Sequence, residues 1–239
     1  MHGNFQANAA LLERLVGGLS GLSCEVLVCA PFPYLSQVSH FVTGTSLELG
    51  AQNVSEHPQG AFTGEVSASM LAEFGCAYVI VGHSERRAMY GDTDEVVAAK
   101  CKAVLAAGMR PVLCVGETLV ERESGLTQVV VARQLAAVLG VLGGAGLARL
   151  VVAYEPVWAI GSGLTATPQQ AQEVHAAIRR QVAGLDANAA VDLRILYGGS
   201  VKPQNARELF VQPDIDGGLI GGAALVADDF LAICQAANS

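Results

Sequence analysis

Short apolar runs alternate with amphipathic stretches along the whole chain, and this alternation limits the fold more than any other feature. The runs are apolar at successive positions, as in strands that are covered on both faces. One helical pattern extends from Ala171 to Val182, with Thr167 as its N-cap and Pro168 at its first position. The predicted strands are Glu25–Ala30, Leu47–Ala51, Tyr78–Val81, Pro111–Val115, Leu150–Ala153, Leu193–Leu196 and Gly218–Ile220.

Strands that alternate with helices predict right-handed β-α-β units and a parallel sheet, so the fold class is α/β. The first predicted helix has no strand before it. The pattern fits a doubly wound open sheet or a nearly complete eight-fold barrel. No shift in composition marks a linker, so we expect one domain over residues 1–239. The absence of G-x-G-x-x-G after the first predicted strand disfavours dinucleotide binding.

Composition narrows the functional class. With 51% hydrophobic and 15% charged residues, the chain can bury a sizeable core. A net charge of -8 without a basic block gives no support for nucleic-acid binding. No apolar run is long enough for a membrane span, and there is no charged leader with an apolar segment. The six cysteines include no C-x-x-C pair, which favours reduced thiols in a cytoplasmic protein.

A lone acid stands at the end of one predicted strand. Glu155 follows the run Leu150–Ala153, and Pro156 prevents the strand from continuing its ladder. The only tryptophan, Trp158, comes next in a loop with glycine joints. This arrangement favours a catalytic base under a moving lid. On these residues alone, a plain strand-to-helix connection with a solvated glutamate is the alternative.

A histidine follows another predicted strand. His83 lies just past Tyr78–Val81, and Ser84 can cap the helix that comes after it. Amides at a helix N-terminus carry partial positive charge, which disfavours imidazolium. We therefore expect a neutral His83 that acts as an electrophile or hydrogen-bond donor. A core or capping histidine is the alternative.

Two glycine-rich stretches follow the last two predicted strands. They read Tyr-Gly-Gly-Ser-Val-Lys at 197–202 and Leu-Ile-Gly-Gly-Ala-Ala at 219–224. Bare amides at a helix start suit a phosphate dianion, and barrels commonly bind phosphate at this place. The five histidines lack ligand spacing with cysteines or acids, so we expect no metal. Base, histidine, phosphate cradle and lid together predict proton transfer beside a carbonyl of a small phosphorylated substrate.

Five motifs are shared with one known family: Gly-Ala-Phe-Thr-Gly-Glu at 60–65, Val-Gly-His-Ser-Glu-Arg-Arg at 81–87, Tyr-Glu-Pro-Val-Trp-Ala-Ile-Gly at 154–161, Tyr-Gly-Gly-Ser-Val at 197–201 and Ile-Gly-Gly-Ala at 220–223. Almost from end to end, the chain resembles triosephosphate isomerase. The resemblance implies a (β/α)8 TIM barrel and a homodimer. It also implies a glycolytic and gluconeogenic aldose–ketose isomerase that interconverts dihydroxyacetone phosphate and D-glyceraldehyde 3-phosphate without cofactor or metal.

The resemblance assigns roles to residues. Glu155 would move the proton between two substrate carbons while His83 polarises the carbonyl. Thr63 would reach the active site of a partner subunit. The phosphate would be held near Gly161, Ser200, Gly221 and Gly222; the lid would comprise Pro156, Val157, Trp158, Leu164, Thr165 and Ala166, with Tyr197 and Ser200 as its latch; Asn53, Glu85, Arg86 and Asp216 would be supporting residues.

The chain departs from the family at two places. Leu164 stands where many members carry lysine, which should affect lid closure modestly at most. The chain begins Met1-His2-Gly3, which resembles the residues just after the family's first strand and its Asn-x-Lys. We therefore expect a barrel without its first strand and with two unpaired edges. The natural protein is expected to be about ten residues longer, enough for one strand.

Two other functions stay open on the sequence. Loss of one preorganised charge can slow an enzyme on the order of a hundredfold, so the missing lysine allows an impaired enzyme or a non-catalytic barrel that binds phosphorylated ligands. Another phosphate-binding barrel enzyme, of the indole-glycerol-phosphate synthase type, is disfavoured by the tryptophan-containing lid and the motif around His83.

Overall fold

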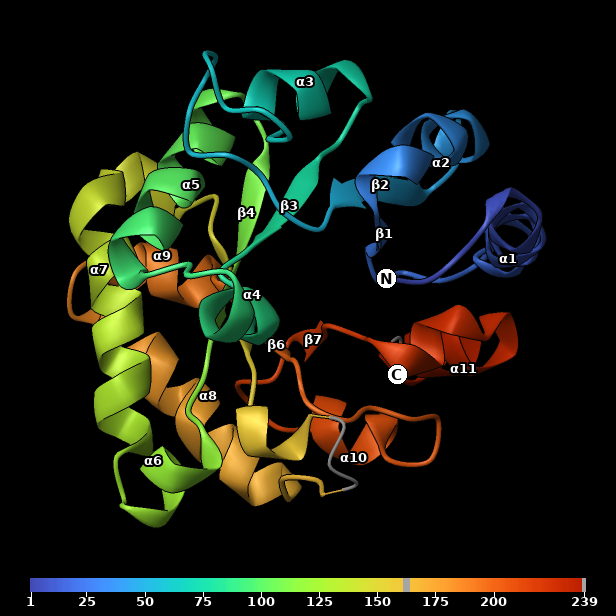
Figure 1. Cartoon of the computed structure of the whole chain (residues 1–239). Helices are drawn as coiled ribbons and strands as arrows, with labels where there is room; N and C mark the ends of the chain where they lie inside the picture. The colour runs from blue at the N-terminus through green and yellow to red at the C-terminus, as the bar shows by residue number, and fades with distance from the viewer. Residues whose placement is uncertain (161–163, 238–239) are drawn as a thin grey trace.

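The computed structural model describes residues 1–160 and 164–237, and its centre is one parallel sheet (Figure 1). Seven strands lie side by side in chain order, from β1 to β7, and every neighbouring pair is parallel. The sheet curls, with helices on its outer side (Figure 1). The strands are β1 (Val26–Ala30), β2 (Leu47–Ala51), β3 (Tyr78–Val81), β4 (Arg110–Val115), β5 (Val151–Tyr154), β6 (Arg194–Tyr197) and β7 (Gly217–Gly218).

The apolar runs form strands because both faces of the sheet are covered. Along β3, Tyr78 and Ile80 belong to one buried cluster, whereas Val79 and Val81 belong to another. Since successive side chains of a strand point to opposite faces, the two clusters are the two faces of the sheet. The first cluster fills the inside of the curl, and the second packs against the helices.

The helices lie where the sequence predicts them, and α8 (Pro168–Ala183) shows why. The Thr167 side chain accepts a hydrogen bond from the backbone of Gln170, whose side chain accepts one from the backbone of Thr167. The other α-helices are α1 (Phe5–Gly18), α2 (Leu35–Val42), α3 (Ala68–Glu73), α4 (Ser84–Met89), α5 (Asp94–Ala106), α6 (Leu119–Glu123), α7 (Thr127–Leu147), α9 (Ala187–Asp192), α10 (Ala206–Phe210) and α11 (Ala227–Ala236); the 3-10 turns are η1 (Phe32–Tyr34), η2 (Val157–Ala159) and η3 (Gly222–Leu225).

Helix α7 is the longest element and differs from the sequence prediction in one respect. Among the described residues it alone is long and apolar enough to cross a membrane by length and composition, although no such run was expected. It packs against α5 and α8, and it buries Val131, Leu135 and Val138 in the core shared with the sheet. Its apolar face is thus explained by packing. Gly143, with φ of 63°, interrupts the helix near its end.

The sheet has two edge strands, as the resemblance implied. In the described part of the chain, β1 pairs only with β2 and β7 only with β6. The helices next to the two edges nevertheless contact each other, and the guanidinium of Arg14 on α1 lies 2.9 Å from the carboxylate of Asp228 on α11. The parallel α/β fold is confirmed, with seven strands in the described residues. The last strand is shorter than predicted: Gly217 and Gly218 form its ladder with β6, and the Leu219 amide adds one hydrogen bond of 3.0 Å to Tyr197 O.

A buried histidine makes the fold sensitive to acid. His175 on α8 is fully buried, and its Nδ1 lies 3.1 Å from the carbonyl oxygen of Asp214. A carbonyl only accepts, so Nδ1 carries the proton in this contact. The ring lies beside Tyr154, with 5.8 Å between ring centroids. Burial lowers the pKa of His175 to about 4, although the Asp214 carbonyl raises it in part.

We predict that the stability due to neutral His175 is fully present above pH 6.5, the pKa of an ordinary histidine. It is lost as the pH falls towards 4, because the unfolded chain then binds a proton that the folded chain does not. The loss reaches about 3 kcal/mol. Urea unfolding of wild type and His175→Asn across this range checks it, with His2→Asn as the control at an exposed position. A stability difference that is independent of pH would contradict the prediction.

Candidate active site

The predicted site residues lie at one edge of the sheet. His83 follows β3, Glu155 follows β5, Ser200 follows β6, and Gly221 follows β7. All these strands belong to one parallel sheet, so their carboxyl ends lie on the same side. This is the side on which barrel enzymes carry their active sites.

The structure brings the predicted base and the predicted histidine into direct contact. His83 Nε2 lies 2.9 Å from Glu155 Oε1. The other carboxylate oxygen, Oε2, accepts a hydrogen bond of 3.0 Å from the Ser84 amide, and the Ser84 hydroxyl lies 3.3 Å from Oε1. Glu155 is only 2% exposed, so a solvated connecting glutamate is excluded. Its charge is held by three donors at the start of α4.

His83 itself caps helix α4, which corrects one prediction. The cap was assigned to Ser84, but Ser84 is the first helical residue, and the His83 ring accepts a hydrogen bond of 3.3 Å from the Glu85 amide. Nδ1 is therefore an acceptor, and Nε2 carries the proton donated to Glu155. This is the neutral tautomer that was expected from the helix amides.

The pKa of His83 does not follow the same expectation. Burial lowers it, but the hydrogen bond that His83 donates to Glu155 and the negative charge of Glu155, with a smaller effect of Glu85, raise the pKa above its usual value. The sequence predicted that the helix amides would lower the pKa of His83, but it did not predict that the Glu155 carboxylate would lie beside the ring. Contact with Glu155 thus opposes the effect of burial and of the helix amides on the pKa of His83.

Two glycines allow the backbone to pass close to Glu155. A Cβ atom built on Gly116 would lie 1.7 Å from the Glu155 carbonyl oxygen, and one on Gly198 would lie 2.9 Å from Glu155 Cγ. Gly198 is also hydrogen-bonded to the strand that leads to the glutamate, since its amide donates to Tyr154 O at 2.7 Å. The position of Glu155 therefore depends on close backbone packing from β4 and β6.

The first half of the predicted lid is held by a buried acid. Glu117 is fully buried, and its carboxylate accepts hydrogen bonds from Trp158 Nε1 at 2.9 Å and from the Tyr154 hydroxyl at 3.1 Å. Arg122 lies 3.4 Å from the same carboxylate and stacks over the Trp158 ring at 4.4 Å. Pro156 leads into η2, which contains Val157 and Trp158.

The second half of the lid returns to the protein at Ala166. Leu164 and Thr165 are exposed, whereas Ala166 is buried. Burial raises the pKa of Tyr197, and the backbone of Ala166 partly offsets this, which puts the Tyr197 side chain beside the end of the lid. Gly161, a predicted phosphate ligand, lies outside the described residues.

The predicted phosphate loops lie after β6 and β7. Ser200 is half-buried, and its carbonyl accepts a hydrogen bond of 3.0 Å from the Asn205 side chain. Gly221 and Gly222 are exposed at the start of η3, and a Cβ built on either would meet no atom within 4 Å. Their backbone is accordingly open to a ligand.

Thr63 lies away from this pair of residues. It is exposed on the loop between β2 and α3, beside Phe62, whose ring stacks on His57 with 3.8 Å between centroids. None of the hydrogen bonds of the described residues joins Thr63 to His83 or Glu155.

The supporting residues form a buried network that the sequence did not reveal in full. Lys100 on α5 is buried and donates to Asn53 at 3.1 Å and to Asp92 at 2.9 Å. Asp92 also lies 3.1 Å from Arg86 of α4. This network ties the loop after β2 to α4, which carries His83. Farther along, Asp216 lies 2.8 Å from the Arg179 guanidinium.

Three contributing residues were missed by sequence reasoning: Glu117, Ser84 as a ligand of Glu155, and Lys100. Glu117 had a usable signal, because it follows a predicted strand as directly as Glu155 does. Lys100 lies between Val97 and Cys101 on the buried face of α5, so its place in an apolar helical stripe was the signal. No group of three or more potential metal ligands occurs among the described residues.

A buried carboxylate hydrogen-bonded to a histidine, at the carboxyl ends of a curled parallel sheet, defines an α/β enzyme of acid–base chemistry. The chain belongs to the triosephosphate isomerase family, because the family model described as "Triosephosphate isomerase" matches residues 1–237.

Curated relatives agree over the full length. The chain is 72% identical to the triosephosphate isomerase of Dechloromonas aromatica over 238 residues, which cover all of this chain and 96% of the relative. It is 65% identical to that of Thiobacillus denitrificans over 237 residues, 99% of this chain and 95% of the relative. It is 57% identical to that of Herminiimonas arsenicoxydans, with 99% and 96% covered.

Proposed function

We propose that the protein is an isomerase that interconverts dihydroxyacetone phosphate and D-glyceraldehyde 3-phosphate. The observation that carries this is the contact of 2.9 Å between His83 and the buried Glu155. Together with the family and with relatives named triosephosphate isomerase, it supports the enzyme over a non-catalytic phosphate binder. The reaction is a step of glycolysis and gluconeogenesis.

The contact supports a mechanism in which the two side chains exchange partners. On substrate binding, the Glu155 carboxylate leaves the donors of α4 and takes a proton from the carbon next to the substrate carbonyl. The His83 Nε2–H, released from Glu155, donates to the carbonyl oxygen, where negative charge develops in the enediolate. The proton of the neighbouring hydroxyl passes to the former carbonyl oxygen, with His83 serving both oxygens, and Glu155 returns its proton to the neighbouring carbon, so that a new carbonyl forms and the isomerisation is complete.

The exchange also accounts for the protonation state of His83. Its raised pKa comes from contact with Glu155, and that cause is absent once the carboxylate faces the substrate. Burial and the Glu85 amide at Nδ1 then favour the neutral imidazole. A neutral donor suits a reaction at neutral pH, because it stabilises the oxyanion without transferring a full proton.

The remaining predicted residues have supporting roles in this proposal. Amides near Ser200 and Gly222, with Gly161, would bind the phosphate dianion. Closure of the lid from Pro156 to Ala166, with Tyr197 as its latch, would exclude water from the enediolate. No step needs a cofactor or a metal ion.

Glu155→Gln is expected to lower kcat on the order of a thousandfold, because the amide cannot accept the proton. A coupled assay with D-glyceraldehyde 3-phosphate measures this, and Glu173→Gln on the exposed side of α8 is the control. Phosphoglycolate should still bind to the Glu155→Gln variant. Normal turnover by that variant would end the proposal, whereas a wild type that binds phosphoglycolate without turnover would favour the non-catalytic alternative.

We also propose that the protein is a homodimer in the cytoplasm. The loop at 60–65 presents Phe62, 42% exposed, next to Thr63, and an apolar loop tip of this kind suits a partner surface. The resemblance assigns Thr63 to a partner's site. All six cysteines are free, which fits a reducing compartment.

Phe62→Asp is expected to convert the dimer into a monomer, because the carboxylate would have to lose its water at the interface. Light scattering after gel filtration measures the change from about twice to once the chain mass of 24.7 kDa. Val191→Asp, at an exposed apolar position on α9, is the control and should remain dimeric. A monomeric wild type would contradict the proposed dimer.

A further inference from the structure

The chain continues its pairing beyond the ends of β4 and β5. The Glu155 amide donates to Val115 O at 2.8 Å, and the Val157 amide donates to Glu117 O at 3.1 Å. In an extended strand, the polar groups of alternate residues face opposite neighbours. Since residues 115 and 117 face the segment that carries Glu155, the N–H and C=O of Gly116 face the other way.

The opposite side of Gly116 has no strand to pair with. There β3 ends at Val81, which is in register with Leu113. A side chain from α7 takes the place of a strand. Gln134 Oε1 accepts a hydrogen bond of 2.8 Å from the Gly116 amide, and Gln134 Nε2 donates one of 3.1 Å to the Gly116 carbonyl.

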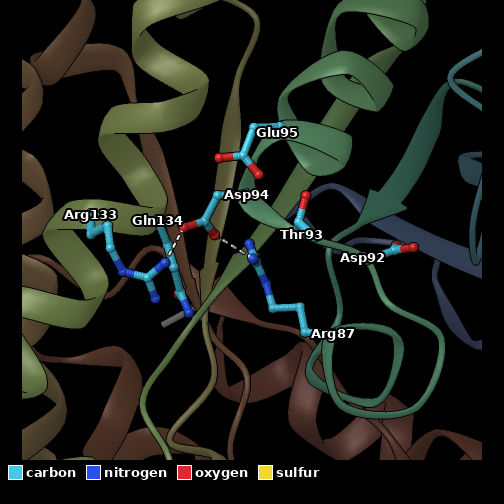
Figure 2. Close-up of a pocket in the computed structure, with 7 residues that line it drawn as sticks. All are labelled: Arg87, Asp92, Thr93, Asp94, Glu95, Arg133 and Gln134. Atoms are coloured by element: carbon cyan, nitrogen blue, oxygen red, sulfur yellow. Dashed lines mark hydrogen bonds and ion pairs between the residues drawn. The ribbon is translucent and has the colours of Figure 1, made fainter.

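Gln134 lies beside a charged network and a cavity. Figure 2 shows Asp94 between the guanidinium groups of Arg133 and Arg87. Arg87 in turn donates to the carbonyl oxygens of Gly82 and Cys114, at 2.8 and 3.1 Å. The cavity has a volume of about 280 Å³ and is lined by Gln134 and this network. Beyond the end of β3, the side chains of Arg87 and Gln134 thus bind the backbone at Cys114 and Gly116 where no strand lies beside it.

Gly116 is the point at which this support reaches the base. It has no side chain, and its Cα packs so closely on the Glu155 carbonyl that an added Cβ would overlap it. Its neighbour Glu117 holds Trp158 at the root of the lid. A shift of Gly116 would therefore displace both Glu155 and the start of the lid.

We propose that Gln134 is a positioning residue for the base: through its two hydrogen bonds to Gly116, it fixes where the Glu155 carboxylate stands. The expected change in kcat rests on the proposed isomerase function, whereas the expected shift of Gly116 does not. Gln134 is only 6% exposed, and both polar atoms of its side chain bind Gly116, so it acts through Gly116. Because the cavity lined by Gln134 is large enough to hold water, we expect removal of the amide to shift the backbone at Gly116 more than it unfolds the protein.

The first test is Gln134→Met, which keeps the length of the side chain but removes both hydrogen bonds. We expect kcat to fall about tenfold or more, since misplacement of a catalytic group by about 1 Å can cost a hundredfold. KM should change less than about twofold, because phosphate binding is separate. The control is Gln181→Met, which removes one helix-to-helix bond, from Gln181 Nε2 to Ala132 O at 2.9 Å, and should keep wild-type kcat.

A spectroscopic readout makes the test independent of activity. Trp158 is the only tryptophan, and its indole N–H donates to Glu117, the residue after Gly116. Its emission spectrum should change in Gln134→Met and not in Gln181→Met. If wild type shows no turnover, the proposed function fails while the emission spectrum still decides the inference.

The second test is Gln134→Glu, which decides the matter if the methionine variant does not fold. Ionised, the carboxylate repels the Gly116 carbonyl; protonated, it can donate to that oxygen and restore both bonds. The ratio of the kcat of this variant to that of wild type should therefore rise as the pH falls. A ratio independent of pH, or a folded Gln134→Met with wild-type kcat and emission, would overturn the inference.

Discussion

The hydrogen bond from the Glu155 amide to Val115 O connects the fold to the site. It continues the pairing of β5 with β4 by one residue. It therefore fixes the position along the strands at which Glu155 leaves the sheet. Gly116 and Gly198 then allow the neighbouring backbones to close around it. Because the strands pair in register, the same sheet also fixes the positions of His83, which follows β3, and Ser200, which follows β6.

The structure buries several charges, and each is compensated. Isolated, such groups would cost several kcal/mol each, so their partners are essential. Glu155 has the donors of α4, Glu117 has Tyr154 and Trp158, and Lys100 has Asp92. These pairs link elements that are far apart in sequence. The residues around Glu155 are thereby held firmly in place. Glu155 itself is held only by hydrogen bonds, which it can exchange for others.

The strands and most helices could be predicted because their signals are local. Apolar runs of four to six residues became strands within one or two residues of the predicted bounds, and Thr167 capped α8 as its position indicated. The predictions of the last strand and of the N-cap of α4 were less accurate. β7 has only Gly217 and Gly218 in its ladder, and His83 competes with Ser84 for the cap because its ring can reach the Glu85 amide.

The sequence by itself determined the parallel α/β class, the set of strand ends and the choice of Glu155 and His83 as candidate site residues, since these follow from periodicity and from residue type at chain positions. Only the tertiary structure decided how the side chains pair. Glu155 meets His83 and Ser84 although more than 70 positions separate them, as the hydrogen bond to Ser84 spans 71. Gln134 meets Gly116 across the side of β4 that β3 leaves open. Such contacts depend on strand register and on the direction in which each helix returns, and no local pattern encodes either.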